Sequence, residues 1–299
     1  MSGRLVIGTR GSKLALWQSQ RVAFLLTRAG RECELKVVRT SGDERPADTL
    51  AGEGVFVTEL EAALRAGEVD LAVHSAKDLP TRPTPGLLVA AHPERADPAD
   101  ALVAAKASAR LAALPRRARV GTDSPRRRGF LLHLRPDLQI LPLSGNVDSR
   151  LRRLESGEID AVVLAAAGLE RLGLAGRIGE RLDPRTLPPA PAQGALAIQC
   201  RSSDSDVRSL LEGLDNEAVS LAVLAERTVL EVTGGGCRTP LGALASLAGG
   251  RLRLVAGMVE PDGSRPRFAV EEEEASAEGA LRAGERAGRA LAAPQEVAG

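Results

Sequence analysis

Aromatic residues, cysteines and long apolar runs are all scarce in this sequence of 299 residues. Aromatic residues make up 2% of the chain, and tyrosine is absent. The cysteines Cys33, Cys200 and Cys237 form no CxxC pair and show no metal-ligand spacing, so we expect no metal site. The most apolar run, Ala161–Leu169, is too short to cross a membrane. Because Met1–Trp17 has no signal-peptide core, the sequence predicts a cytoplasmic protein with reduced thiols.

Charge is nearly balanced, with 40 basic and 39 acidic side chains and a net charge of +1. Without an excess of either sign, we expect binding to neither nucleic acid nor membrane. Lysine is rare, so most of the positive charge is arginine, whose planar guanidinium matches a carboxylate or phosphate. Genome composition explains the bulk arginine count but not where individual arginines sit. The length and the 43% hydrophobic content predict a soluble chain of two or three domains.

Strand and helix patterns alternate along the first two thirds of the chain. The first set of expected elements comprises Leu5–Ile7, Leu14–Ala29, Glu34–Val38, Val55–Ala66 and Val69–Val73. A second set comprises a helix ending near Arg135, then Leu138–Leu143, Val147–Glu155 and Ile159–Ala165. Three signatures recur in the same order, namely Gly8-Thr9 with Gly121-Thr122, Ser41-Gly42 with Ser144-Gly145, and Gly67-Glu68-Val69-Asp70 with Gly157-Glu158-Ile159-Asp160. We interpret this repetition as two similar α/β lobes.

Proline-rich segments predict that the chain crosses between the lobes twice. Arg95–Pro98 leads into the second lobe, and Leu187–Pro191 leads back to the first. The strand Ala195–Cys200 and a helix near Asp206–Leu214 then complete the first lobe. We therefore expect lobe 1 from residues 1–95 and 193–214, and lobe 2 from residues 96–192.

The last third of the chain, residues 215–299, has the pattern of a small α+β domain. Helical spacing covers Glu217–Val232 and Ser276–Ala293. Between them lie three strand candidates, Leu241–Leu247, Leu252–Val259 and Arg267–Glu272, separated by glycine-containing turns. This pattern predicts a three-stranded antiparallel sheet.

Polar and basic side chains from both lobes are expected to meet at one interlobe cleft. In open α/β sheets, ligands bind beyond the carboxyl ends of the strands, where helix N-termini favour anions. The side chains at these positions are Arg10, Ser12, Ser75, Lys77, Thr122, Ser124, Arg126, Arg127, Arg150 and Arg171. A solvated surface charge explains any one of the arginines, but six basic side chains at matching strand ends predict a site for a polycarboxylate.

Asp78 and Cys237 point to chemistry beyond anion binding. Asp78 is a carboxylate among cations, and it serves either as a catalytic group that stabilises a developing cation and relays a proton or as an ion-pair partner of Lys77. Cys237 follows three glycines at a helix end, where a thiol is available for covalent chemistry. The alternative for a cysteine is a small, buried hydrophobic side chain, and this role fits Cys33 and Cys200 better. The glycines and charges of residues 43–54 predict a mobile lid.

Motifs along nearly the whole chain carry a family resemblance. They include Gly8-Thr9-Arg10, His74-Ser75-Ala76-Lys77-Asp78-Leu79-Pro80, Gly145-Asn146-Val147, Gln193-Gly194-Ala195 and Gly236-Cys237. Together they resemble the porphobilinogen deaminase (hydroxymethylbilane synthase) family. The resemblance implies two periplasmic-binding-protein-like (type II) lobes, a third α+β domain and a transferase of tetrapyrrole and heme biosynthesis. It also implies a dipyrromethane cofactor, joined to Cys237 by a thioether, onto which porphobilinogen is condensed with loss of ammonia until hydroxymethylbilane is released.

By the same resemblance, Asp78 is the catalytic carboxylate and the six basic side chains hold acetate and propionate groups. Three positions depart from the family pattern: Ser144 replaces an arginine, Glu53 lies where a lysine is frequent, and Asp123 replaces a serine. These changes alter which carboxylates are held more than the reaction class, and Arg128 is a candidate to compensate. We expect a monomer with porphobilinogen as its partner. The alternative is a non-enzymatic two-lobed binding protein for an anionic solute.

Overall fold

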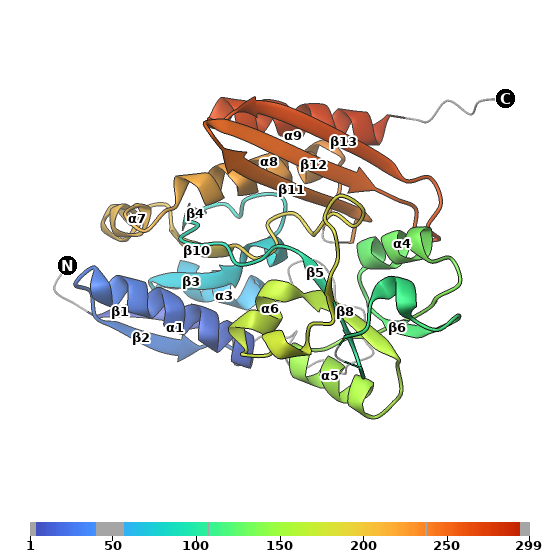
Figure 1. Cartoon of the computed structure of the whole chain (residues 1–299). Coiled ribbons are helices and arrows are strands. Elements are labelled where there is room, and N and C mark those ends of the chain that lie inside the picture. Colours follow the sequence, from blue (N-terminus) through green and yellow to red (C-terminus); the bar gives the residue numbers. More distant parts are fainter. Residues whose placement is uncertain (1–3, 40–56, 107, 237, 294–299) are drawn as a thin grey trace.

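The computed structural model describes residues 4–39, 57–106, 108–236 and 238–293 (Figure 1). The expected lid at residues 43–54 and the candidate attachment residue Cys237 lie outside the described residues. No described helix is long and apolar enough to cross a membrane.

Lobe 1 is built on a five-stranded sheet with strand order β2-β1-β3-β10-β4. Its strands are β1 (Leu5–Thr9), β2 (Cys33–Val37), β3 (Leu71–Ser75), β4 (Leu87–Ala91) and β10 (Leu196–Arg201). Its helices are α1 (Lys13–Arg28), α3 (Thr58–Arg65) and α7 (Ser205–Glu212), with the short 3-10 turn η1 (Ala76–Asp78) directly after β3. Strands β2, β1 and β3 run parallel, whereas β10 runs antiparallel to both of its neighbours. Fully buried Ile7, Leu71 and Ile198 from adjacent strands form the centre of its core.

Lobe 2 repeats this plan with strand order β7-β6-β8-β5-β9. Its strands are β5 (Asp100–Ala104), β6 (Arg119–Gly121), β7 (Gln139–Leu141), β8 (Ala161–Ala165) and β9 (Glu180–Arg181). Its helices are α4 (Pro125–Leu134), α5 (Val147–Glu155) and α6 (Ala166–Arg171), with 3-10 turns η2 (Leu111–Ala113) and η3 (Ala175–Arg177). Strand β5 takes the place of β10, because it runs antiparallel to β8 and to β9.

The sequence repeat corresponds to matching contacts in the two sheets. The Asp70 carboxylate accepts a hydrogen bond from the Val6 amide at 2.8 Å, and the Asp160 carboxylate accepts one from the Arg119 amide at 2.7 Å. Val6 and Arg119 each lie two residues before the recurring Gly-Thr pair. The repetition thus fixes the register of equivalent strands in both lobes.

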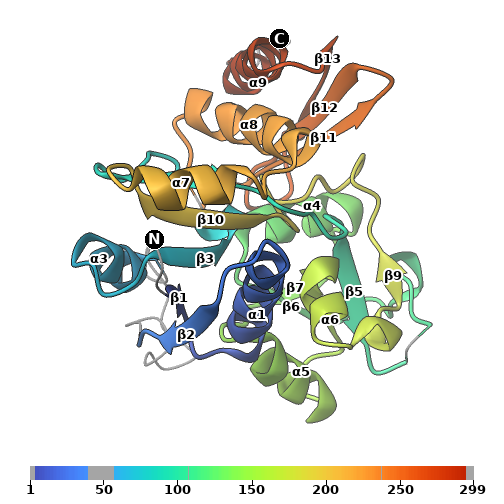
Figure 2. The ribbon, with the colours of Figure 1, turned by 90° about the vertical axis from the view of Figure 1, so that its left-hand side faces the viewer.

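The chain crosses between the lobes from β4 to β5 and again from β9 to β10, and the two crossing segments pair with each other. Arg95 and Ala195 form an isolated antiparallel bridge, and the Ala96 amide donates to the Gly194 carbonyl at 3.0 Å. Helix α1 of lobe 1 lies beside α6 of lobe 2 (Figure 2). Lys13 of α1 also forms an ion pair with Asp148 of α5 at 3.0 Å.

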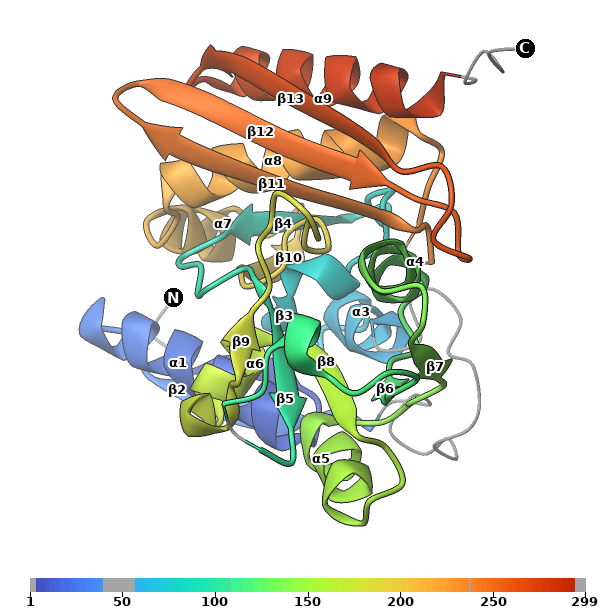
Figure 3. The same ribbon diagram turned by 45° about the vertical axis from the view of Figure 1, so that its right-hand side comes forward.

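The C-terminal domain stacks helices α8 (Glu217–Val232) and α9 (Ala277–Ala292) on one face of a three-stranded sheet (Figure 3). The sheet is antiparallel, in the order β11 (Leu241–Ala248), β12 (Arg251–Met258) and β13 (Arg267–Glu274). Asn216 and Ser276 cap the two helices by accepting backbone N–H hydrogen bonds. The expected fold class, two mixed α/β lobes and an α+β domain, is confirmed.

Glu226 joins the C-terminal domain to both crossing segments. This fully buried carboxylate of α8 accepts two hydrogen bonds from the Arg95 guanidinium, at 2.6 and 3.0 Å. It also accepts hydrogen bonds from the amides of Ala192, at 2.6 Å, and Ala245, at 2.8 Å. Since a buried charge is tolerated only when it is paired and hydrogen-bonded, this junction ties the third domain to the connection between the lobes.

Candidate functional site

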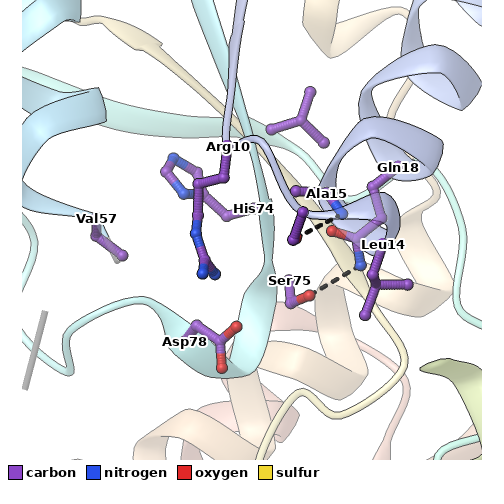
Figure 4. Close-up of a pocket in the computed structure, with 10 residues that line it drawn as sticks. Arg10, Leu14, Ala15, Gln18, Val57, His74, Ser75 and Asp78 are labelled. Atoms are coloured by element: carbon purple, nitrogen blue, oxygen red, sulfur yellow. Dashed lines mark hydrogen bonds between the residues drawn. The ribbon is translucent and has the colours of Figure 1, made fainter. Parts of the chain in front are cut away.

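A pocket of about 420 Å³, counted with its open side, lies beyond the carboxyl ends of β1 and β3 (Figure 4). Of the predicted site residues, it is lined by Arg10, Ser12, Ser75 and Asp78. The structure therefore brings these four side chains of lobe 1 together, as the strand-end rule predicts.

Local structure at two strand ends places the pocket side chains. Strand β1 ends at Thr9, so Arg10 lies at the mouth and Ser12 becomes the N-cap of α1, where its hydroxyl accepts from the Ala15 amide at 3.3 Å. Strand β3 ends at Ser75, whose hydroxyl accepts a hydrogen bond from Gln18 of α1 at 2.8 Å. The η1 turn that follows brings Asp78 to the side of the pocket toward which the Arg10 guanidinium points (Figure 4).

Lys77 connects this pocket to lobe 2 through a polar network. Its ammonium donates to the Gln193 side chain at 3.2 Å, and the Gln193 amide donates to Asp100 at 2.9 Å. Asp100, fully buried at the start of β5, is 2.6 Å from Arg127 and 2.7 Å from Arg126. Each of these arginines also donates to a backbone carbonyl. Arg126 and Arg127 are thus already engaged with a carboxylate of the protein.

Burial and mutual repulsion shift the pKa values of this network. Burial lowers the pKa of Lys77 to about 8; the Asp78 carboxylate opposes this shift and the Arg127 guanidinium adds to it. Burial alone would raise the pKa of Asp100, but the two guanidinium groups hold it far below its usual range. Burial, together with the charge of Arg127, lowers the pKa of Arg150 to about 10, against the opposing effect of Asp123 and Asp78. The site therefore concentrates more positive charge than its own carboxylates offset.

Arg150 and Arg171 carry buried donors that no described residue satisfies. The Nε atom of each is buried and accepted by no described residue. Arg150 lies in the first turn of α5, which Asn146 caps. Arg171, at the end of α6, donates to the Gly194 carbonyl at 2.7 Å and stacks over the Trp17 ring at 5.6 Å. Arg171 thus bridges lobe 2, a crossing segment and α1 of lobe 1.

The remaining lobe 2 residues have structural contacts at the end of β6. Thr122 is buried and accepts from the Ser124 amide at 3.2 Å, while the Ser124 hydroxyl caps α4 by accepting from the Arg127 amide. Ser144 donates a hydrogen bond to Asp123, and the Leu143 amide donates to the same carboxylate at 2.8 Å. Two of the departures from the family pattern therefore contact each other. Arg128, the candidate to compensate, is exposed and donates to the Pro261 carbonyl of the C-terminal domain.

The C-terminal domain holds the segment that follows Asp78. Arg227 of α8 donates to the carbonyls of Leu79, Pro80 and Thr81. The Thr81 hydroxyl donates to the Gly235 carbonyl at 3.2 Å. The described part of the glycine-rich loop before position 237 thus lies next to the segment that carries Asp78.

Sequence reasoning missed several residues of the network. Asp100 was given no role, although an acid at the start of the apolar run Ala101–Ala104 was a usable signal. Gln193 belongs to a quoted motif but received no role, and Gln18 was not singled out. The sequence carries no local signal for the pairing of Arg95 with Glu226, because the two residues are 131 positions apart.

Comparison with known sequences identifies the family. Residues 5–209 match the family described as "Porphobilinogen deaminase, dipyromethane cofactor binding domain", and residues 220–293 match "Porphobilinogen deaminase, C-terminal domain". The chain belongs to the porphobilinogen deaminase family. It is 50% identical over 264 residues to a porphobilinogen deaminase of Roseiflexus sp. (strain RS-1), covering 87% of this chain and 86% of the relative. A porphobilinogen deaminase of Sorangium cellulosum (strain So ce56) is 48% identical over 299 residues, 98% of each chain.

Solved structures add a weak likeness. The Bordetella pertussis BvgS periplasmic VFT2 domain superposes with a TM-score of 0.44 at 19% identity, covering 70% of this chain and 86% of that chain. A periplasmic substrate-binding protein of an ABC transporter from Coxiella burnetii gives 0.45 at 16% identity, covering 75% of this chain and 96% of that one. Membership of the porphobilinogen deaminase family rests on the sequence matches, which give no added support to a non-enzymatic binding protein.

Proposed function

We propose that this chain is a hydroxymethylbilane-forming transferase, which condenses porphobilinogen units with loss of ammonia on a covalent dipyrromethane cofactor. The observation that carries the proposal is the pair of porphobilinogen deaminase matches, which together span residues 5–209 and 220–293. The pocket supports it, because the Asp78 carboxylate lies there with the Arg10 guanidinium, a group that suits a substrate with acetate and propionate groups.

The residues present fit a polycarboxylate cofactor. The cations Arg10, Lys77, Arg126, Arg127 and Arg150 outnumber the carboxylates Asp78, Asp100 and Asp123 by five to three. Arg150 also has a buried Nε donor that no described residue accepts, and a ligand carboxylate satisfies such a donor. When bound, the dipyrromethane supplies the pyrrole ring from which the chain grows. Arg10, Lys77, Arg150 and Arg171 would hold carboxylates. Ser12, Ser75, Thr122 and Ser124 lie at or just before the starts of α1, η1 and α4.

Asp78 carries the proposed catalytic role. Loss of ammonia from porphobilinogen leaves a cation on the substrate, and a carboxylate close to the pyrrole nitrogen stabilises that cation as it forms. The same carboxylate can hold the proton of the leaving amine. Arg126 and Arg127 act partly through Asp100, since both pair with that buried carboxylate, and they set the positive potential at the lobe 2 side.

A mass measurement tests the proposal through Cys237. Intact protein should exceed the mass of its sequence by one dipyrromethane, and Cys237→Ser should remove the excess. Cys33→Ser is the matched control, because Cys33 lies at the start of β2 and should leave the adduct in place. An active wild-type protein with an unmodified Cys237 would contradict the attachment, whereas an inactive protein without adduct under assembly conditions would contradict the function itself.

The proposal also covers the cellular compartment, the oligomeric state and the domain bounds. We propose a cytoplasmic monomer, with lobe 1 from residues 1–95 and 193–214, lobe 2 from 96–192 and the cofactor-carrying domain from 215–299. The mutual pairing of the two crossing segments supports a division near Ala96 and Gly194.

A further inference from the structure

His74 stands between the pocket and a buried polar chain in lobe 1. It is 5% exposed, lies on β3 and lines the pocket with Arg10 and Asp78 (Figure 4). Its Nε2 atom is 3.1 Å from the side-chain oxygen of Gln199, on the neighbouring strand β10. Gln199 in turn contacts Glu61 of α3. Neither the anion-binding arginines nor Asp78 explain this chain, so its role is a separate question.

Glu61 fixes the orientation of the Gln199 amide. Both carboxylate oxygens of Glu61 accept from the Thr84 hydroxyl, at 2.9 Å each, and one accepts from the Gln199 side chain at 2.8 Å. A carboxylate only accepts hydrogen bonds, so the Gln199 NH₂ must face Glu61 and its oxygen must face His74. Because that oxygen also only accepts, His74 must carry its proton on Nε2.

The other ring nitrogen of His74 is therefore an acceptor. In the neutral imidazole with a proton on Nε2, Nδ1 holds a free lone pair. No described residue donates a hydrogen bond to Nδ1. Burial lowers the pKa of His74 to about 4; the hydrogen bond with Gln199 opposes this shift and the charge of Arg10 adds to it. The ring is thus neutral at physiological pH and has an acceptor nitrogen that no described residue uses.

We propose that His74 is a ligand-contacting residue whose Nδ1 accepts a hydrogen bond from an N–H group of the bound pyrrole substrate, in a tautomer fixed by Glu61 through Gln199. The proposal rests on the proposed function for the identity of the ligand, but the tautomer stands on the protein contacts alone. Pyrrole substrates present N–H donors as well as carboxylates, so a site rich in arginine needs acceptors too. Asp78 and His74 supply them from the same pocket.

Nitrogen-15 NMR of histidine-labelled protein tests the tautomer directly. The chain has three histidines, and His92 is an internal reference because its Nδ1 lies 2.7 Å from the Leu196 carbonyl, which requires the opposite tautomer. His133 is exposed and should show averaged shifts. We expect His74 as the Nε2–H form from pH 8 to pH 5, and loss of the single form in Gln199→Met. A His74 signal with the proton on Nδ1, or a cationic ring at pH 7, would overturn the proposal.

Ligand contact is tested by titrating porphobilinogen into the same sample and by three variants. The Nδ1 shift of His74 should move on binding. His74→Leu should raise KM by about 3- to 10-fold, the loss of one neutral hydrogen bond, with a smaller change in kcat. His74→Asn places an oxygen near the Nδ1 position and should recover part of KM, and His74→Gln, which extends to the Nε2 position, should not.

The outcomes separate this inference from the proposed function. His133→Leu serves as the exposed control and should leave KM unchanged. If wild-type protein turns over porphobilinogen while His74→Leu keeps its KM and the Nδ1 shift stays fixed on binding, the ligand contact is refuted and the function stands. If wild-type protein neither binds nor converts porphobilinogen, the function fails, and the tautomer measured without ligand remains as the test of the Glu61–Gln199–His74 chain.

Discussion

The charged residues of this site fall into two groups. Some are fully paired with other protein groups, and others keep a donor that a ligand can satisfy. Asp100 is fully buried, forms ion pairs with Arg126 and Arg127, and accepts a hydrogen bond from the Gln193 amide. Arg150, in contrast, has a buried donor that no described residue accepts. Arginines at equivalent strand ends therefore differ in the effect of their removal. Removing one leaves a buried carboxylate without a partner, and removing another takes away a donor for the ligand.

Arg127→Leu and Arg150→Leu should separate stability from cofactor assembly. Removing Arg127 leaves the buried Asp100 carboxylate short of a partner, so we expect a loss of about 3 kcal/mol in the free energy of unfolding. Arg150→Leu should change that free energy by less than about 1 kcal/mol and yet prevent loading of the cofactor. Urea denaturation and intact mass measure the two effects. Equal stability of both variants would contradict the division.

Asp78→Asn should reduce turnover while leaving the fold intact. The amide keeps the size of the carboxylate but loses the charge that stabilises a developing cation. We expect turnover to fall by roughly 10²–10⁴, the range for acid–base and electrostatic groups. Steady-state kinetics on a variant purified with its cofactor attached is the measurement. In a plain binding protein there would be no catalysis to lose, and near-wild-type turnover would refute the catalytic role.

The two crossing segments determine how the lobes meet, and they lie very close together at Gly194. Its φ of +87° is strained for any other residue, and an added Cβ would lie 2.4 Å from the Ala96 carbonyl oxygen. Gly194→Ala should therefore separate the crossing segments and disturb the hydrogen bond from Arg171. We expect a loss of about 2–4 kcal/mol in the free energy of unfolding. Gly176→Ala, where a Cβ meets open space, is the matched control, and a similar result for both would refute this account.

The elements predicted best from the sequence carry their own end signals. Helices Val147–Glu155 and Glu217–Val232 have the predicted bounds, because Asn146 and Asn216 precede regular apolar spacing. Strands β4, β5 and β9 were not predicted, since the short apolar runs of β4 and β5 and the two residues of β9 show no alternating pattern. The strand ends of the pocket followed from a general rule of α/β sheets, whereas the partners of Asp100 and Glu226 depend on tertiary contacts that no local pattern contains.

For the whole molecule, the buried histidines predict a loss of stability in mild acid. The pKa of His74 is about 4 in the folded chain against 6.5 as its ordinary value, so between these values the unfolded chain binds more protons. The free energy of unfolding should therefore fall as pH drops from 6.5 to 4, by up to about 3 kcal/mol from this residue. Burial also lowers the pKa of His92, which adds in the same direction.

Denaturation curves at pH 7.5, 6.0 and 4.5 measure this dependence. His74→Asn should flatten the slope, and His133→Asn, at an exposed position, should leave it unchanged. Asp100 contributes in a different window, because its lowered pKa matters only once unfolded carboxyl groups take up protons, below about pH 4. If His74→Asn leaves the pH dependence of the free energy of unfolding unchanged, protonation of the His74 ring is not the cause of the loss of stability.

The position of β10 also determines the order in which the lobes can be completed during synthesis on the ribosome. The five strands described for lobe 2 lie within residues 100–181, so that sheet can close once this stretch has emerged. Among the described strands, β4 pairs only with β10, which ends at residue 201, and until then β3 and β4 both present open edges. The lobe that begins the chain is thus finished after the lobe that follows it. A nascent chain of which residue 181 but not residue 196 has left the ribosome should hold a folded lobe 2 beside an incomplete lobe 1 that recruits chaperones.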